Sequence, residues 1–179
     1  FHIYGALNMG REFSEIAENS NDAAFYNKIH FERPGFGFGA DYSLDLELIS
    51  PRIKWRAGFY YEMKRAVQQV SYLTTNGSTR DESLELQAKI LSFTGIYKTK
   101  IYDLLFGANY TLMDTDADSY YNDYEVKDDY GFHAGFGYER NDLRYQLVYR
   151  YLTHETKADD GYKGKIDLSS ILLTVGTYY

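Results

Sequence analysis

The sequence of 179 residues contains no cysteine and no long hydrophobic run. Without cysteine the chain cannot form a disulfide framework, a thiolate metal site or a thiol redox centre. No uncharged stretch approaches the roughly 18 apolar residues of a membrane-spanning helix. Any insertion of this chain into a membrane must therefore use strands that close into a barrel.

Positive charge is also in short supply, with 19 Lys and Arg against 26 Asp and Glu and a formal net charge of −7. A protein whose main partner is nucleic acid needs a basic surface, so we expect no nucleic-acid partner. The chain begins at Phe1 without an initiator methionine or a signal sequence, and we therefore expect a mature or trimmed chain.

Aromatic residues are abundant, with 20 Tyr and 11 Phe beside a single Trp. Tyrosine suits a membrane interface because its ring can lie in the apolar layer while its hydroxyl reaches the headgroups. The composition therefore favours a chain that meets lipid, with alternate residues of each strand facing it.

The clearest pattern lies at 130–138, which reads Tyr-Gly-Phe-His-Ala-Gly-Phe-Gly-Tyr. A period of two predicts a β-strand whose two faces meet different environments. The glycines share the polar face, where a water-exposed sheet would only be weakened by them. The interior of a small closed barrel does need small side chains, because its opposite walls crowd each other. We therefore expect the polar face inside and the aromatic face outside, as in a barrel surrounded by lipid.

The same alternation recurs often enough along the chain to predict eight strands. Two of the cleanest outward runs, Ile53 to Met63 and Tyr102 to Leu112, have the length of about 9–11 residues with which a tilted strand crosses a bilayer. We find no linker and expect a single domain over 1–179. The predicted strands are 2–10, 29–45, 51–70, 84–97, 102–113, 130–138, 143–153 and 165–179.

The connections between these strands alternate between long and short. Short turns on one rim and long polar loops on the other are typical of bacterial outer-membrane barrels, with the short turns on the periplasmic side. With these strands and connections, both termini are expected on the rim with the short turns. The long connections are 11–28, 71–83, 114–127 and 154–164, and the short ones are 46–50, 98–101 and 140–142.

In this architecture, and in its last segment Ile171–Tyr179, the chain resembles the small eight-stranded outer-membrane proteins of the OmpA transmembrane-domain and OmpX/Ail-like kind. The segment alternates apolar residues and ends on an aromatic, like the signal read by the outer-membrane assembly machinery, although that family most often ends on Phe. The resemblance implies an all-β, eight-stranded antiparallel up-and-down transmembrane β-barrel. It also implies a place in the outer membrane of a Gram-negative bacterium, with the lipid bilayer and lipopolysaccharide as partners, and we expect a monomer.

The main rival is a soluble eight-stranded barrel of the lipocalin type, with the apolar face inside around a ligand. That fold would expose the glycine rows to water. It would also force the aromatic residues of eight strands into one small lumen, where they would be hard to pack.

If the aromatic faces of the strands meet lipid, charged residues of both signs collect in the lumen. Charges removed from water need partners, so we expect a network of ion pairs and hydrogen bonds that plugs the barrel, with a narrow water path as the alternative. The residues expected there are Asp41, Asp45, Lys54, Arg56, Glu62, Lys64, Glu85, Lys89, Asp103, His133, Glu139, Arg144 and Arg150.

One loop motif predicts a weak calcium site. In the segment 114–125, Asp114, Asp116, Asp118 and Glu125 occupy positions 1, 3, 5 and 12 of the calcium-loop pattern. Ser119 replaces the glycine that usually makes the sharp turn, and strands rather than helices are expected on either side. A solvated acidic surface loop is the alternative.

An enzyme that modifies lipid A would need an activated hydroxyl with a histidine base near the outer rim. The candidate histidines are His30 and His154, but no nucleophile motif accompanies them, and we expect no enzyme and no cofactor beyond the possible Ca²⁺. We expect instead that the long acidic loops act in adhesion, surface interaction or envelope stability through an extracellular partner, with a narrow channel for ions or small solutes as the alternative. The conceivable hydroxyl partners are Ser14, Ser20, Thr153 and Thr156.

Overall fold

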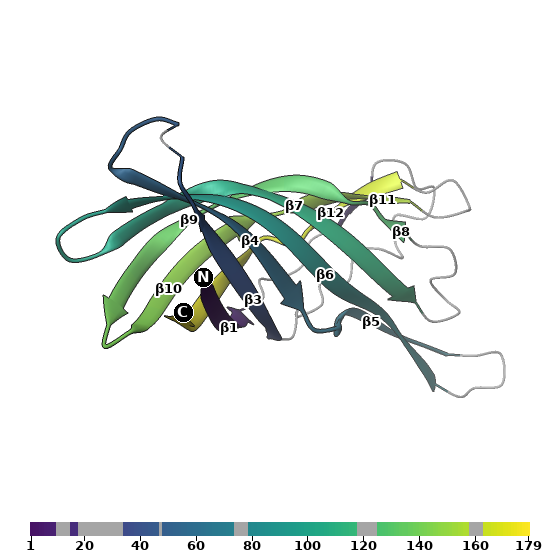
Figure 1. Ribbon diagram of the computed structural model, residues 1–179. Helices are drawn as coiled ribbons and strands as arrows, with labels where there is room; N and C mark the ends of the chain where they lie inside the picture. The colour runs from purple at the N-terminus through teal and green to yellow at the C-terminus, as the bar shows by residue number, and fades with distance from the viewer. Residues whose placement is uncertain (10–14, 18–33, 47, 74–78, 118–124, 158–162) are drawn as a thin grey trace.

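The computed structural model describes residues 1–9, 15–17, 34–46, 48–73, 79–117, 125–157 and 163–179. Its main feature is a closed barrel in which each strand pairs antiparallel with its neighbours in chain order, and β13 returns to β1 (Figure 1). This confirms the all-β, eight-stranded antiparallel up-and-down barrel. The barrel strands are β1 (His2–Met9), β3 (Gly35–Leu44), β4 (Ile53–Glu62), β6 (Thr79–Lys98), β7 (Asp103–Ala117), β9 (Asp129–Arg140), β10 (Leu143–Tyr151) and β13 (Ser170–Tyr178).

The apolar faces of the strands point outward, as predicted. Phe36 is 61% exposed and Phe132 is 59% exposed, while the residues between the outward ones are largely buried in the lumen. So broad an exposed apolar surface is incompatible with a water-soluble monomer and is typical of a barrel surrounded by lipid. The soluble barrel with an apolar interior is therefore excluded.

Outward tyrosines form two girdles around this belt. Pairs of tyrosines face each other across neighbouring strands at both levels, with Tyr138 opposite Tyr145 and Tyr110 opposite Tyr130. Girdles of this kind mark the two lipid–water interfaces of outer-membrane barrels. The girdle toward the short turns contains Tyr42, Tyr102, Tyr138, Tyr145 and Tyr179, and the girdle toward the loops contains Tyr61, Tyr110, Tyr130, Tyr149 and Tyr151.

The inward glycines make room for large inward tyrosines on neighbouring strands. The ring of Tyr4 lies against Gly39, and the ring of Tyr60 lies against Gly37, so that a Cβ atom at either glycine would overlap the ring. The two rings are themselves parallel, with centroids 6.4 Å apart. The glycine row and the tyrosines thus fill the lumen together.

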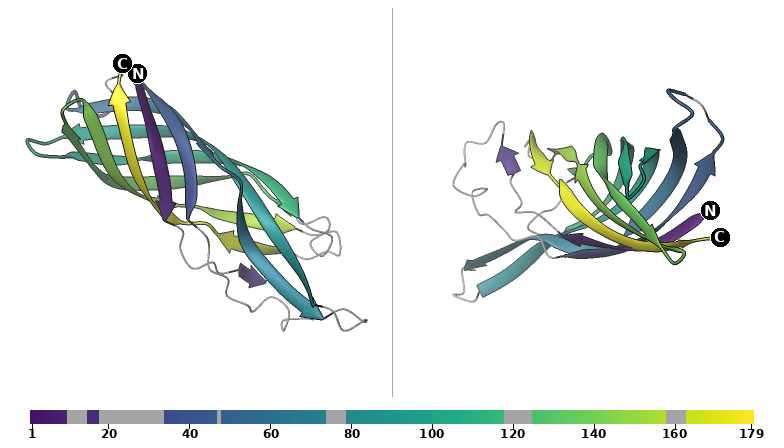
Figure 2. Two further views of the ribbon diagram at one scale, coloured as in Figure 1. Left: turned by 90° about the horizontal axis from the view of Figure 1, so that it is seen from below. Right: turned by 90° about the vertical axis from the view of Figure 1, so that its left-hand side faces the viewer.

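Short turns and both termini lie at one end of the barrel (Figure 2). Asn141 and Asp142 turn the chain between β9 and β10 with φ angles of 52° and 61°, as a type I′ hairpin turn requires. The terminal residues are hydrogen bonded to each other, because Tyr179 N–H donates to the carbonyl of Phe1 at 2.9 Å. The predicted position of the termini is confirmed.

The strands extend further on the loop side than the sequence predicted. A bulged hairpin of β5 (Arg65–Leu73) with β6 projects beyond the barrel (Figure 1), in a region predicted as loop from 71 to 83. A separate four-stranded sheet continues other barrel strands past short breaks. Backbone pairing maintains these extensions beyond the apolar belt, where lipid no longer selects alternating residues. The second sheet contains β2 (Glu15–Ala17), β12 (Lys163–Asp167), β11 (Thr153–Lys157) and β8 (Glu125–Val126).

The two faces of β6 are the reverse of those expected near the loop side, where Glu85 and Lys89 were predicted to face the lumen. Ser92 and Thr94 line the lumen, and the period of two then brings Leu86, Ala88 and Ile90 inward as well, where they are buried. The charged residues between them consequently point outward. The register with β4 and β7 fixes one orientation for the whole strand, even where the local pattern of apolar residues reverses.

We predict that Leu173→Arg destabilises the barrel by about 2–4 kcal/mol, because Leu173 lies mid-strand on the outward face, opposite Leu7 and Leu147. Thr177→Arg, near the short-turn rim, is the matched control and should cost only about 0–1 kcal/mol. Urea unfolding of protein reconstituted in lipid vesicles measures both. Equal costs for the two substitutions would contradict the assignment of the outward face to lipid.

We predict that Gly39→Val destabilises the barrel by about 1–3 kcal/mol, because the new side chain must displace the Tyr4 ring in a filled lumen. Gly5→Val provides the control, since a Cβ atom there meets nothing within 4 Å. The gel-mobility transition from folded to heat-unfolded protein reports both variants. A Gly39→Val barrel as stable as the Gly5→Val barrel would show that the lumen is not filled as described.

Candidate functional site

A network of charged and phenolic side chains crosses the lumen near the short turns. The fully buried Arg144 forms an ion pair with Asp103, with Nη2 and Oδ2 3.0 Å apart, and donates from Nη1 to the hydroxyl of Tyr178. Arg56 donates to the same hydroxyl at 2.7 Å, and its Nη1 lies 3.9 Å from Asp41 Oδ2. These five side chains come from five different strands, and they are one another's ion-pair and hydrogen-bond partners.

His2 completes this network on the β1 side. Its buried ring donates from Nδ1 to Asp41 Oδ2 at 3.2 Å, and it stacks on Tyr4 with ring centroids 5.2 Å apart. Asp41 therefore binds both a histidine and a guanidinium. Buried charges that are paired and hydrogen bonded in this way close the lumen without leaving the charge uncompensated.

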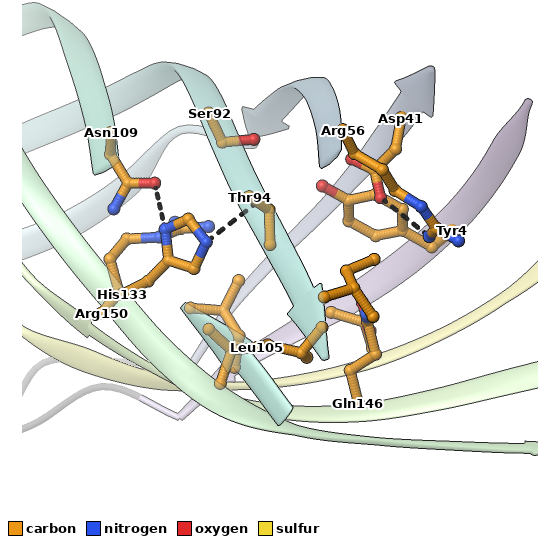
Figure 3. A pocket seen from close by; sticks show the side chains of 14 residues that line it. Tyr4, Asp41, Arg56, Ser92, Thr94, Leu105, Asn109, His133, Gln146 and Arg150 are labelled. Carbon is orange, nitrogen blue, oxygen red and sulfur yellow. Dashed lines mark hydrogen bonds and ion pairs between the residues drawn. The ribbon is translucent and has the colours of Figure 1, made fainter. Parts of the chain in front are cut away.

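A cavity of about 50 Å³ lies in the middle of the lumen, with polar residues along its wall (Figure 3). His133 donates from Nδ1 to Asn109 Oδ1 at 2.8 Å, and the hydroxyl of Thr94 donates to His133 Nε2 at 3.0 Å. A hydroxyl, an imidazole and an amide in this order have the connectivity of a nucleophilic triad. The cavity is nevertheless far smaller than the roughly 300–1,000 Å³ of ligand pockets, so no organic substrate fits beside them.

The loop-side end of the lumen is mostly apolar. Beside this apolar wall, Asn8 donates from Nδ2 to the buried carboxylate of Glu62 at 2.9 Å. The remaining space is a cavity of about 20 Å³. The lumen is therefore filled by ion pairs at one end and by a small apolar core at the other. The apolar residues that surround this second cavity are Leu86, Ala88, Ile90, Met113, Leu152 and Leu168.

Part of the expected lumen charge lies elsewhere. Lys64 pairs with Glu85 at 2.9 Å and Lys89 pairs with Asp114 at 2.5 Å, all with exposed side chains. The prediction that Lys64, Glu85 and Lys89 face the lumen is therefore wrong. The reversed faces of β6 account for Glu85 and Lys89, and Lys64 follows the end of β4. Asp45, Lys54 and Glu139 are exposed near the short turns. The prediction is confirmed for Asp41, Arg56, Glu62, Asp103, His133, Arg144 and Arg150.

Among the described residues, Lys89 is a predicted lumen charge that meets a calcium candidate, Asp114. Its Nζ atom donates a hydrogen bond to Asp114 Oδ2. Asp114 and Asp116 belong to β7, which continues to Ala117, and Glu125 begins β8. Asp118 lies outside the described residues, and within them no group of three potential ligands gathers. The calcium site stays a prediction.

Polar side chains bridge the breaks between the barrel and the second sheet. Ser169 Oγ accepts a hydrogen bond from the N–H of Leu152 at 3.1 Å, and Asp128 accepts one from the N–H of Met113 at 2.8 Å. These side chains take the place of ladder partners where the strands separate. At these two positions, side-chain hydrogen bonds connect the loop-side sheet to the barrel.

His154 is the only histidine of the loop-side candidates within the described part of the chain. It is buried in β11 and donates from Nδ1 to the carbonyl of Lys127 at 2.9 Å. Burial lowers its pKa, although the hydrogen bond to Lys127 opposes that shift. Its partner is thus a backbone carbonyl, and His30, Ser14 and Ser20 lie outside the described residues.

Sequence reasoning missed two tyrosines that organise the lumen, Tyr4 and Tyr178. The first covers Gly39, and the second accepts hydrogen bonds from Arg56 and Arg144. Both occupy inward positions of strands whose outward faces the sequence identified. The period of two could have placed both tyrosines in the lumen. Because the chain contains so many tyrosines, however, we expected this residue type at the membrane interfaces.

The described residues contain no helix that is long and apolar enough to cross a membrane. Comparison of sequences finds no matching family model and no matching curated protein. Comparison of structures finds the crystal structure of Neisserial surface protein A (NspA), with a TM-score of 0.56 and 10% identity, covering 99% of this chain and 96% of that one.

Two further structures cover 99% of this chain at lower similarity. The crystal structure of Ail, the attachment invasion locus protein of Yersinia pestis, is 12% identical with a TM-score of 0.47 and 98% of its chain covered. The solid-state NMR structure of the outer membrane protein AlkL in lipid bilayers is 13% identical with a TM-score of 0.45 and 89% covered. Together with the closed barrel and its apolar belt, the similarity to NspA shows that this chain has the fold of the small eight-stranded outer-membrane barrels.

Proposed function

We propose that this protein is an integral outer-membrane barrel of a Gram-negative bacterium that acts through its loop side, in adhesion or other surface contacts, and not as an enzyme or a pore. The observation that carries the proposal is the contrast between a filled lumen and a built-up loop side. Strands continue past the tyrosine girdle into a second sheet and a projecting hairpin. Structure that extends beyond the lipid is available to partners outside the cell.

The orientation in the membrane follows from the two rims. Outer-membrane barrels have short turns on the periplasmic side and longer loops outside. The hairpin turn at Asn141 and Asp142 and both termini would then face the periplasm. The second sheet and the β5–β6 hairpin would face the medium.

Charged pairs just beyond the belt support contact with lipopolysaccharide as well. Lys89 and Asp114 lie on the outer wall, and Lys127 pairs with Glu155 at 3.0 Å on the loop-side sheet. Exposed lysines at this level could meet headgroup phosphates, while the neighbouring carboxylates would suit bridging cations. By binding lipopolysaccharide in this way, the exposed charged pairs beyond the apolar belt would also contribute to envelope stability.

The test is surface display in a Gram-negative host that does not adhere. Cells with the barrel should bind to immobilised extracellular matrix or to epithelial cells several-fold more than cells without it. Replacing 74–78, 118–124 and 158–162 by Gly-Ser turns should abolish that gain, because these segments connect the loop-side strands. A matched variant altered only at 48–50, near the opposite rim, should adhere normally.

Conductance in planar bilayers tests the alternative of a narrow channel. We expect no steady conductance, because buried side chains fill much of the described lumen and the two cavities they leave in it have volumes of only about 50 and 20 Å³. Steady single-channel currents, with adhesion unaffected by loop replacement, would overturn the proposal in favour of transport. Adhesion that survives every loop replacement would also contradict it.

The acidic segment 114–125 provides a separate prediction. Four carboxylates in Asp114, Asp116, Asp118 and Glu125 would bind Ca²⁺ with a dissociation constant of about 10⁻⁴–10⁻³ M, the range of extracellular modules. Titration with Ca²⁺ should then change the tyrosine fluorescence or NMR signals of the folded protein. The double variant Asp114→Asn, Asp116→Asn should not respond.

The control for calcium is Asp45→Asn with Asp142→Asn, which removes the same charge near the opposite rim. This variant should keep the response of the wild type. Absence of any response in the wild type, up to several times the expected concentration, would leave the segment as an acidic surface only.

A further inference from the structure

One end of the central cavity is rich in hydrogen-bond donors that have no acceptor. Arg150 lines the cavity with only 7% of its surface exposed, and its Nε and Nη1 atoms have no hydrogen-bond partner among the described residues. Asn109, which is 3% exposed, lines the same cavity, and its Nδ2 atom also lacks a partner. Buried N–H groups normally have partners, so this end of the cavity is suited to an acceptor.

His133 determines how the donors are arranged. It lies directly opposite Arg150 in the β9–β10 ladder, and its Nδ1–H donates to Asn109 Oδ1. Because the amide oxygen is engaged in this way, the donating NH₂ group of Asn109 remains for the cavity. Figure 3 shows Asn109, His133 and Arg150 together at one end, with Asp41, Arg56 and Tyr4 at the other.

The charges around the cavity do not balance. Two guanidinium groups line it, those of Arg56 and Arg150, but only one carboxylate does, that of Asp41. Asp41 is already shared between Arg56 and His2. No carboxylate of the described residues forms an ion pair with Arg150, whose guanidinium carbon lies over the ring of Tyr60, 4.8 Å from the ring centroid.

We propose that this cavity binds one small monovalent anion, chloride, held by the guanidinium of Arg150 and the amide NH₂ of Asn109. An unpaired buried charge is costly, and a bound anion removes that cost while accepting the free N–H groups. A volume of about 50 Å³ accommodates a chloride ion, which is slightly larger than water, but not an anion of the size of gluconate. The anion then serves as an internal counter-ion of the lumen, which the proposed surface function does not require.

The first experiment locates the bound anion by crystallography. Crystals of the folded barrel grown in bromide should give an anomalous difference peak beside Arg150 and Asn109. The variant Asn109→Asp keeps an oxygen for His133 but supplies a fixed negative charge beside Arg150, so it should fold and lose the peak. Arg140→Gln removes an exposed arginine at the end of β9 and should keep the peak.

The second measurement is stability in chloride against gluconate at equal ionic strength, because gluconate is too large for the cavity. At a chloride concentration ten times the dissociation constant, the equilibrium constant for unfolding of the wild type should fall about tenfold. The Asn109→Asp variant should be insensitive to the exchange, and Arg150→Gln, if it folds, should be insensitive too. Arg140→Gln should behave like the wild type.

Two results would overturn the proposal. One is a wild-type barrel without a bromide peak at Arg150 and with equal stability in both salts, which would mean that the donors are hydrated only. The other is an Asn109→Asp barrel that folds and retains both the peak and the chloride dependence. Either result would leave the surface function untouched, since that function does not depend on the lumen ion.

Discussion

The structure depends on the crowding that follows when only eight strands close on themselves. Every inward position must fit against the opposite wall, so glycines and large rings alternate across the lumen, as at Gly39 beneath Tyr4 and Gly37 beneath Tyr60. The same closure pairs the backbone of each of the eight barrel strands on both sides and removes the open edges that lipid could not solvate. The aromatic belt is the complement of this interior, because an unbroken row of large side chains has room only on the outside.

Crowding also explains why the lumen is filled in two different ways. Near the short turns, long charged side chains reach across the interior and meet at Tyr178, whose hydroxyl joins Arg56 to Arg144. Near the loops, the apolar side chains of β6 line a small cavity together with Leu152 and Leu168. A charged network needs partners at fixed positions, which the rigid part of the barrel provides, whereas apolar packing tolerates the breaks where strands leave the barrel.

The consequence for function lies in the relation between the filled lumen and the extended loop side. A barrel whose interior is occupied gains little as a passage, but it is a rigid support for whatever lies beyond the lipid. Ser169 and Asp128 connect the second sheet to the barrel by replacing missing ladder partners. A rigid support of this kind lowers the ordering cost of binding, which is consistent with the proposed role in surface contacts.

The sequence by itself determined the number of barrel strands, the outward face of most of them and the rim that carries the termini, because alternation is a local property that needs no knowledge of neighbours. It also identified Asp41, Arg56, Asp103 and Arg144 as interior charges. Only the tertiary structure decided the orientation of β6, since one register must serve the whole strand although its loop-side half reverses the pattern around Lys89. The partners of the interior charges were decided there as well, because the meeting of Arg56 and Arg144 at Tyr178 depends on how strands distant in sequence are staggered around the closed barrel.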